Sequence, residues 1–316
     1  MTNGRLSKRI RARKGFALGP ILTLAFLLGL ALLLTACGGS ETSTTAAQSS
    51  TTAAPVTTAS PTSAAAGQTA LILASTTSTQ DSGLFDVLIP AFKQAYPQYD
   101  VKVVAVGSGE ALKLGQTGDA DVLLVHSPAA EQTFMDAGYG VDRKAVMYND
   151  FVIVGPAADP AAIKGMTDAA GAFKKIADSK SLFYSRGDQS GTNTKELAIW
   201  KSATITPAGD WYQTTGQGMG ETLTIADQKS GYTLTDRATW LAKKDALKNL
   251  ALLVEGDKAL FNQYHVITCK AAKSVQGAND FMSWIVSPDV QQNVIATFGL
   301  DKYGQALFIP NADSAK

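Results

Sequence analysis

Between residues 69 and 154, short apolar runs alternate with segments of helical periodicity. Four apolar runs predict buried strands, at residues 69–74, 101–106, 121–125 and 151–154. The segments between them predict a helix over residues 83–96, which Pro97 ends, and helices that begin at Glu110 and Pro128. Because helices lie between short apolar strands, the pattern indicates parallel βαβ units with helices on both faces of the sheet.

A second series of strands and helices follows. The apolar runs at residues 182–184 and 264–268 predict two further strands. Helical periodicity recurs at residues 192–201, 221–228, 237–243, 278–286 and 289–298. The strand at residues 151–154 leads out of the first series, so we expect the chain to cross from one α/β unit to another.

These patterns predict an α/β fold of two lobes, each a mainly parallel sheet flanked by helices. We expect the first lobe to comprise residues 69–152 together with 262–316, and the second lobe residues 153–261. A cleft between two lobes is a favoured place for a small ligand.

The N-terminal residues have the pattern of a targeting segment. Basic residues occur throughout residues 5–14, and an uncharged apolar run follows at residues 16–34. The run ends in Leu34-Thr35-Ala36-Cys37, which resembles the lipobox of bacterial lipoproteins. We therefore expect residues 1–36 to be a signal peptide and Cys37 to be lipidated, which places the protein outside the cytoplasmic membrane as an anchored lipoprotein. The alternative is a retained transmembrane anchor.

A polar segment separates this leader from the folded part. Residues 38–67 are almost entirely Ser, Thr, Ala, Gly, Gln and Pro, with Glu41 as their one charged residue. Such a composition cannot offset the entropy of ordering the chain. We therefore expect residues 37–68 to be the lipidated cysteine and a disordered tether.

Charge and composition exclude several classes of function. Six of the 28 basic residues precede residue 15, whereas all 27 acidic residues follow residue 40, so the folded part is mildly acidic. This argues against a nucleic-acid surface. Two cysteines and two histidines are too few for a zinc ribbon or an iron–sulfur site. Neither His126 nor His265 lies in a recognisable nucleophile motif, so we expect no enzyme, no resident cofactor and structural roles for both rings.

The first of three polar turns follows the first predicted strand. Residues 75–79 are five consecutive hydroxyl residues, and a helix follows them. The carboxyl ends of parallel strands bind ligands in such sheets, and a helix N-terminus adds free N–H groups. This pattern predicts an anion site at Thr76, Thr77 and Ser78. The alternative is simple capping of the helix by Asp81 or Ser82.

The other two turns offer donors of the same kind. Gly107-Ser108-Gly109 lies between a strand and a helix, where the backbone can approach a ligand closely. Arg186 lies at the end of the strand at residues 182–184, and the helix that starts near Ser190, Gly191 and Thr192 follows it. A guanidinium presents a fixed fork of donors to an oxyanion. The alternative is that Arg186 forms only a surface pair with Asp188.

Together with the rest of residues 69–312, these three turns resemble the periplasmic tungstate-binding proteins of ABC importers, which have the type II periplasmic-binding-protein fold. The motifs that carry the resemblance lie at residues 73–84, 106–109, 120–122, 148–151, 185–192, 219–220 and 232–237. Two positions depart from the family pattern: Ser75 stands where threonine is commoner, and Cys269 stands where a small apolar residue is usual. We expect Cys269 to pack as a small hydrophobe.

The resemblance implies a solute-binding lipoprotein that captures tungstate and delivers it to the permease of an ABC importer. It places oxyanion contacts on Thr76, Thr77, Ser108, Arg186 and Thr192, and the same turns add Ser78, Ser190 and Gly191 to the predicted site. We expect a monomer. The alternatives are molybdate, phosphate or sulfate as the ligand and, more distantly, a hydrolase.

The charge state of the ligand bears on this choice. Tungstate and molybdate accept hydrogen bonds but donate none at neutral pH, so a site built only of donors favours them over hydrogen phosphate. A carboxylate facing the ligand would remove that preference. We therefore expect Asp81 and Asp188 to point away, with Asp81 holding loop backbone and Asp188 holding Arg186.

Overall fold

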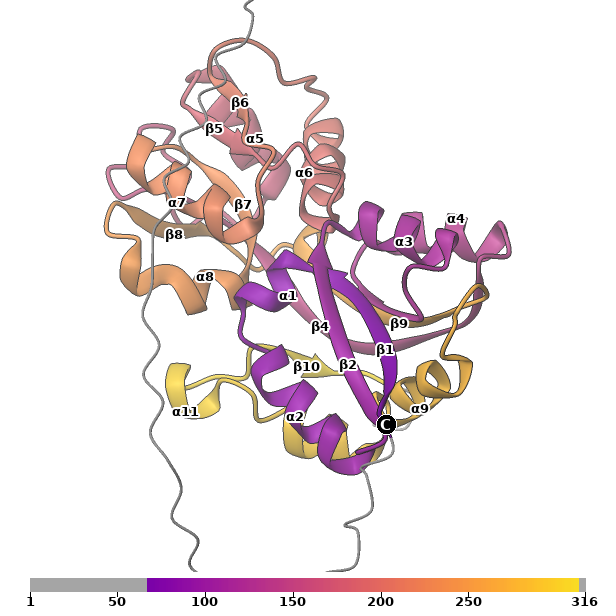
Figure 1. The fold of residues 1–316 in the computed structure, drawn as a ribbon. Helices are drawn as coiled ribbons and strands as arrows, with labels where there is room; N and C mark the ends of the chain where they lie inside the picture. Colours follow the sequence, from indigo (N-terminus) through magenta and orange to yellow (C-terminus); the bar gives the residue numbers. More distant parts are fainter. Residues whose placement is uncertain (1–66, 313–316) are drawn as a thin grey trace, which may run out of the picture. The chain divides into compact units, whose positions relative to one another are not determined.

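Strands β1, β2 and β3 form the parallel part of the main sheet in the computed structural model, which describes residues 67–312. β1 (Thr69–Thr76) pairs along its whole length with β2 (Tyr99–Val106) and, on its other side, with β3 (Val122–Val125). Helices α2 (Phe85–Ala95) and α3 (Ser108–Thr117) connect these strands (Figure 1). The arrangement confirms the predicted βαβ units.

Strand β4 (Gly140–Pro156) is shared by two groups of elements. Up to Asp150 it pairs antiparallel with β9 (Phe261–Cys269), and from Phe151 onward it pairs with β7 (Thr233–Asp236) and β8 (Leu250–Val254). We call the elements around β1–β3 and β9 the first lobe, and those around β5–β8 the second lobe (Figure 1). The exchange of partners supports the predicted lobe boundary near residue 152, which stays a prediction.

The length of β4 corrects the sequence prediction, which placed a strand only at residues 151–154. The first half of β4 contains Asp142, Arg143 and Lys144 and has few buried positions, so it shows no apolar run. The α/β class is confirmed, but the sheets are less parallel than predicted. β1–β2, β1–β3 and β5–β6 are parallel, whereas β4 pairs antiparallel with β7, β8, β9 and β10, and β9 pairs antiparallel with β3.

The second lobe packs around a cluster of aromatic side chains. Trp200 is buried, and its ring lies 4.3 Å from that of Phe173 and 5.3 Å from that of Phe183. Sequence analysis missed α5 and β6, because β6 is only three residues long and α5 begins in a run of small residues, and it also missed β7 and the apolar strand β8. The elements of this lobe not yet given are α5 (Ala169–Asp178), β5 (Phe183–Ser185), α6 (Gly191–Ser202), β6 (Tyr212–Thr214), α7 (Met219–Lys229), α8 (Arg237–Lys243), and the 3₁₀ turns Lys244–Ala246 and Lys258–Leu260.

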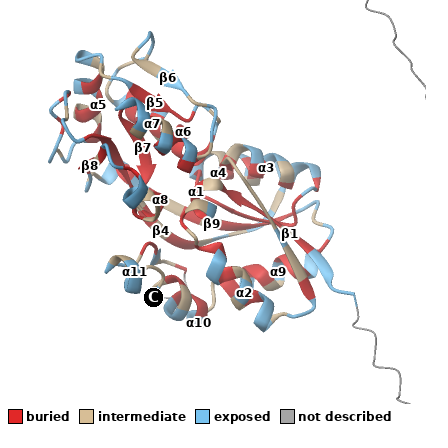
Figure 2. Ribbon diagram, turned by 60° about the vertical axis from the view of Figure 1, so that its left-hand side comes forward, coloured by how far each residue is buried: buried red, intermediate tan, exposed pale blue. Residues whose placement is uncertain are grey.

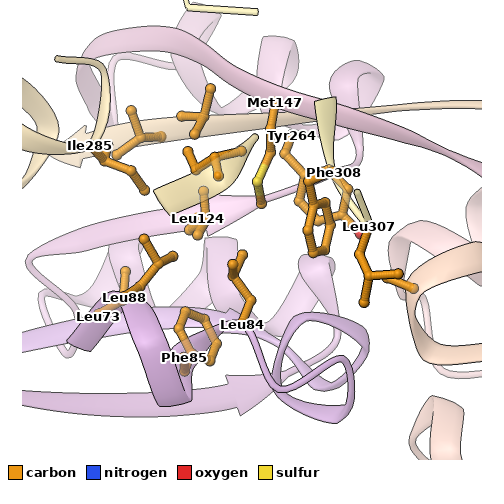
Figure 3. Packing of buried hydrophobic residues seen from close by; sticks show 14 of the residues in the cluster. Leu73, Leu84, Phe85, Leu88, Leu124, Met147, Tyr264, Ile285, Leu307 and Phe308 are labelled. Carbon is orange, nitrogen blue, oxygen red and sulfur yellow. The ribbon is translucent and has the colours of Figure 1, made fainter. Parts of the chain in front are cut away.

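The C-terminal segment packs against the first lobe and closes its core. Leu307 and Phe308 belong to the same buried cluster as Met147 and Tyr264 of the sheet (Figure 3). Leu84 and Leu88, at the start of α2, contribute to this cluster from the helix. Figure 2 shows buried strands and helices whose outward sides are exposed. A π-helical turn replaces half of the helix predicted at residues 289–298. The remaining elements are α1 (Thr77–Asp81), α4 (Pro128–Asp136), α9 (Val275–Ile285), α10 (Pro288–Val290), the π-helical turn Gln291–Ile295, α11 (Leu300–Tyr303) and β10 (Ile309–Pro310).

Cys269 packs in the core as expected. The residue is 3% exposed, and a Cβ added to Gly115 would lie 2.8 Å from its sulfur atom. Burial raises the pKa of the thiol to about 12, so the thiol stays protonated at neutral pH.

Within residues 67–312, no helix has both the length and the apolar character that a bilayer span requires. The predicted signal peptide, Cys37 and nearly all of the predicted tether lie outside the described residues.

Candidate oxyanion site

The hydroxyl-rich turn forms the short helix α1 rather than an open loop. Thr76 caps this helix, because its Oγ1 accepts a hydrogen bond of 3.3 Å from the N–H of Thr79 and lies 2.8 Å from the Thr79 hydroxyl. The alternative, capping of the following helix, is met in part by Ser82, whose Oγ accepts a 3.3 Å hydrogen bond from the N–H of Leu84 directly before α2. The Thr76 hydroxyl is therefore engaged within α1, and the hydroxyls of Thr77 and Ser78 point to other partners.

The N-termini of α3 and α6 lie next to each other. Ser108 is the first residue of α3, and Ser190 caps α6 by accepting a 3.2 Å hydrogen bond from the N–H of Asn193. A Cβ added to Gly107 would lie 3.3 Å from the Cα of Ser190, so the glycine permits this close approach. The first N–H groups of a helix have no acceptor within it and carry a partial positive charge. Two such ends side by side favour an anion.

Two hydroxyls at these helix ends have no partner among the described residues. Ser108 Oγ and the Oγ1 of Thr192, the second residue of α6, are both buried and form no hydrogen bond there. Buried hydroxyls in proteins are nearly always hydrogen-bonded. Both groups can therefore donate to a ligand.

Arg186 connects the second lobe to the hydroxyls of α1. Its Nη2 donates to Thr77 Oγ1 at 2.9 Å, and its Nη1 donates to Ser78 Oγ at 3.4 Å. Asp188 Oδ2 accepts from Nη2 at 2.6 Å and from Nε at 3.1 Å, so Asp188 holds Arg186 as predicted. The guanidinium is only 2% exposed, so the alternative of a surface pair was wrong. The buried guanidinium is therefore held in position by the partly exposed carboxylate of Asp188.

Both acidic residues of these turns are already paired with donors of the protein. Asp188 Oδ1 accepts from the N–H of Ser190 at 3.1 Å, in addition to the bonds of its Oδ2 with Arg186. Asp81 Oδ2 accepts from the N–H of Gly220 at 2.9 Å, and its Oδ1 lies 3.8 Å from Lys243 Nζ. Burial raises the pKa of Asp81. Asp81 therefore holds backbone at the start of helix α7 in the second lobe, whereas loop backbone was expected.

His126 lies behind the N-terminus of α6 and is neutral. Its Nδ1 is 2.9 Å from Asn262 Oδ1, and its ring stacks on Tyr264 at 4.6 Å. Asn262 Nδ2 donates to Asn149 Oδ1, so the Asn262 oxygen accepts from Nδ1–H of the histidine. Burial above all lowers the pKa of His126 to about 3, and the nearby Arg186 charge lowers it further. A Cβ on Gly191 would lie 2.8 Å from Nδ1, which explains the glycine there.

Sequence reasoning did not identify the amide pair that supports this histidine. Asn149 and Asn262 lie opposite each other where β4 and β9 pass between the lobes. Asn149 belongs to a motif of the family resemblance, but a single buried asparagine does not indicate its partner in the sequence.

The other histidine, His265, lies away from the site, with its Nδ1 2.7 Å from Glu131 Oε2. Among the described residues, no group of three or more His, Cys, Asp or Glu side chains could hold a metal ion.

Comparison with known proteins agrees with this geometry. A family model described as a PBP superfamily domain matches residues 45–289. The chain is 51% identical over 249 residues to the tungstate-binding protein TupA of Peptoclostridium acidaminophilum, which covers 77% of this chain and 86% of the relative. It is 41% identical over 248 residues to TupA of Campylobacter jejuni, which covers 76% of this chain and 90% of the relative.

Solved structures give the same result. The tungstate ABC transporter structure from Geobacter sulfurreducens superposes with a TM-score of 0.65 at 45% identity and covers 71% of this chain and 97% of its own. TupA of Desulfovibrio alaskensis G20 superposes with a TM-score of 0.62 at 46% identity and covers 78% of this chain and all of its own. The chain belongs to the PBP superfamily and, within it, to the family of the TupA tungstate-binding proteins. These relatives are named as binding proteins, which agrees with the prediction that this chain is not an enzyme.

Proposed function

We propose that this protein captures tungstate outside the cytoplasmic membrane and delivers it to an ABC importer. The observation that carries the proposal is a pair of buried hydroxyls, Ser108 Oγ and Thr192 Oγ1, which lie at two adjacent helix N-termini and have no hydrogen-bond partner within residues 67–312. Arg186 adds the positive charge that a doubly charged oxyanion needs. The names of the relatives in the same family supply the identity of the anion.

The proposed ligand contacts come from both lobes. Arg186 and Thr192, with the N–H groups of Gly191 and Thr192, bind the anion from the second lobe, and Ser108 binds it from the first. Thr77 and Ser78 face the same guanidinium, so they bind the anion beside it. Thr76 and Ser190 act through their caps, which hold α1 and α6 in place.

The pairing of the two acidic residues supports selection against protonated anions. Hydrogen phosphate carries an O–H group that requires an acceptor, and an unsatisfied buried donor costs about 1–3 kcal/mol. The carboxylates of Asp81 and Asp188 already accept hydrogen bonds from the protein. Tungstate and molybdate carry no O–H group that needs an acceptor, so the site prefers them to hydrogen phosphate. Molybdate remains the second candidate because it presents the same charge and shape.

Removing either partnerless hydroxyl tests this assignment. Ser108→Ala and Thr192→Val are each expected to weaken tungstate binding about threefold to tenfold, since a neutral hydrogen bond contributes about 0.5–1.5 kcal/mol. Calorimetric titration of the purified variants measures the change. Ser202→Ala, at the far end of α6, removes an exposed hydroxyl that donates to the Ala198 carbonyl, so its affinity should match wild type. Equal affinity in all three variants would remove Ser108 and Thr192 from the site.

Transport requires attachment and delivery as well as binding. We propose a monomer whose lobes, residues 69–152 with 262–316 and residues 153–261, close on the anion and present it to the importer permease. The leader pattern supports a lipid anchor at Cys37, where residues 1–36 are removed and residues 37–68 form the tether. The body of the protein then lies outside the membrane within reach of the permease.

The lipid anchor has a direct test. Cys37→Ala should release the protein from the membrane fraction or leave an uncleaved precursor, because the lipid would have no attachment point. Metabolic labelling with a fatty acid, followed by fractionation, measures both effects. Cys269→Ala is the matched control and should label like wild type, since that thiol is buried. Continued labelling of the Cys37→Ala variant would contradict the proposal.

A further inference from the structure

Helix α7 begins at the boundary between the lobes without a cap of its own. Its N-cap residue is Gly218, which has no side chain to accept a hydrogen bond from the first turn. The acceptor comes instead from α1 of the first lobe, where Asp81 Oδ2 accepts from the N–H of Gly220 at 2.9 Å. Asp81 therefore acts as the N-cap of α7, although it belongs to the opposite lobe.

Two further contacts join α1 to the second lobe at the same place. Lys243 Nζ at the end of α8 lies 3.8 Å from Asp81 Oδ1, and Thr239 Oγ1 lies 3.1 Å from the carbonyl oxygen of Ser78. The Asp81 side chain is 18% exposed and that of Lys243 is 42% exposed, so solvent screens the ion pair and the backbone bond is the stronger contact.

Glycines make this close approach possible. A Cβ added to Gly220 would lie 3.1 Å from Asp81 Oδ2 and 3.1 Å from Lys243 Cε. A Cβ added to Gly218 would lie 3.4 Å from the Cβ of Thr77. Side chains at these two positions would therefore hold α7 away from α1. They would also hold it away from Thr77, which bonds to Arg186.

We propose that Asp81 is a closure latch: it caps α7 from the opposite lobe and so stabilises the closed arrangement in which the α1 hydroxyls and Arg186 face one ligand. Asp81 is a positioning residue and does not contact the anion. The proposal rests on the proposed function, since a latch on closure matters only when a ligand is held between the lobes. Its loss should mainly speed ligand release, because the contact holds α1 of the first lobe against α7 of the second lobe.

Dissociation kinetics test the latch. In the full-length protein, Asp81→Ala should raise the rate of tungstate release, measured by stopped-flow tryptophan fluorescence, about fivefold to tenfold, the change expected from losing one helix cap. Association should change much less. Asp81→Asn keeps an acceptor oxygen and should restore most of the slow release.

Asp168 provides a matched control. It caps α5 within the second lobe by accepting a hydrogen bond from the N–H of Gly171, and α5 packs on α6 of the same lobe. Asp168→Ala loses a cap of the same kind, so it should lower the melting temperature while leaving the release rate unchanged. An unchanged release rate in Asp81→Ala, or an equal change in both variants, would overturn the latch.

Hydrogen exchange separates failure of the latch from failure of the proposed function. If wild type binds no tungstate, the proposed function fails and release rates carry no information. The amides at the start of α7 can still be compared in ligand-free protein. Faster exchange at residues 219–222 in Asp81→Ala than in wild type would support the cross-lobe cap, and equal exchange would overturn it.

Discussion

Replacing Arg186 with glutamine is expected to weaken tungstate binding by at least about tenfold. A hydrogen bond to a charged group contributes about 1.5–3 kcal/mol, and tenfold in affinity corresponds to about 1.4 kcal/mol. The guanidinium is buried and held by Asp188, so in the proposed site it would meet the anion in a fixed position with little competition from water. Calorimetric titration of Arg186→Gln against tungstate measures the loss.

The stability of this variant needs a separate control. Arg186→Gln leaves Asp188 Oδ2 without its charged partner, and breaking a buried ion pair destabilises a protein. Arg143→Gln breaks a comparable pair with the buried carboxylate of Glu131, so it should lower the melting temperature but leave tungstate affinity unchanged. Unchanged affinity in Arg186→Gln for every oxyanion tested would place Arg186 outside the site.

Acid should destabilise the wild-type protein through His126. The folded protein holds the pKa of this imidazole at about 3, against an ordinary value of 6.5, because the ring is buried. Between these values the unfolded chain binds the proton and the folded chain does not, so stability is present above about pH 6.5 and is lost as the pH falls toward 3. Each pH unit costs up to about 1.4 kcal/mol.

A variant isolates this contribution. His126→Gln keeps an amide that can donate to Asn262 but cannot titrate, so its stability advantage over wild type should grow by about 3 kcal/mol between pH 6.5 and pH 4. Urea unfolding at several pH values measures the difference. Asp236, whose pKa burial raises to about 6, titrates in the same range with the opposite sign. It is present in both proteins and cancels in the comparison. Parallel stability curves would show that His126 does not cause the acid sensitivity.

Sequence patterns identified the strands that can be recognised from their own residues alone. β1, β2 and β3 are apolar runs bounded by turns, and they appear where predicted. Strand β4 could not be found in full, because its charged first half is stabilised by pairing with β9, a partner more than a hundred residues away. Pairing over such a distance leaves no mark in the pattern of β4 itself.

In the candidate site, too, residue types could be predicted from the sequence, but contacts between distant segments could not. Arg186 and the hydroxyls of α1 are conspicuous residue types at strand ends, so sequence reasoning could select them. The roles of Thr76 and Ser190 as caps, the occupation of Asp81 by Gly220, and the support of His126 by Asn262 depend on contacts between distant segments. These contacts decide which donors are free for a ligand, and the sequence alone could not rank them.

Calorimetric titration of the purified wild-type protein with tungstate, molybdate, sulfate and phosphate at neutral pH tests the central claim most directly. We expect one tungstate ion to bind each protein molecule tightly, and hydrogen phosphate to bind far more weakly because the carboxylates of Asp81 and Asp188 already accept hydrogen bonds from the protein. Absence of tungstate binding, or phosphate binding of equal strength, would contradict the account.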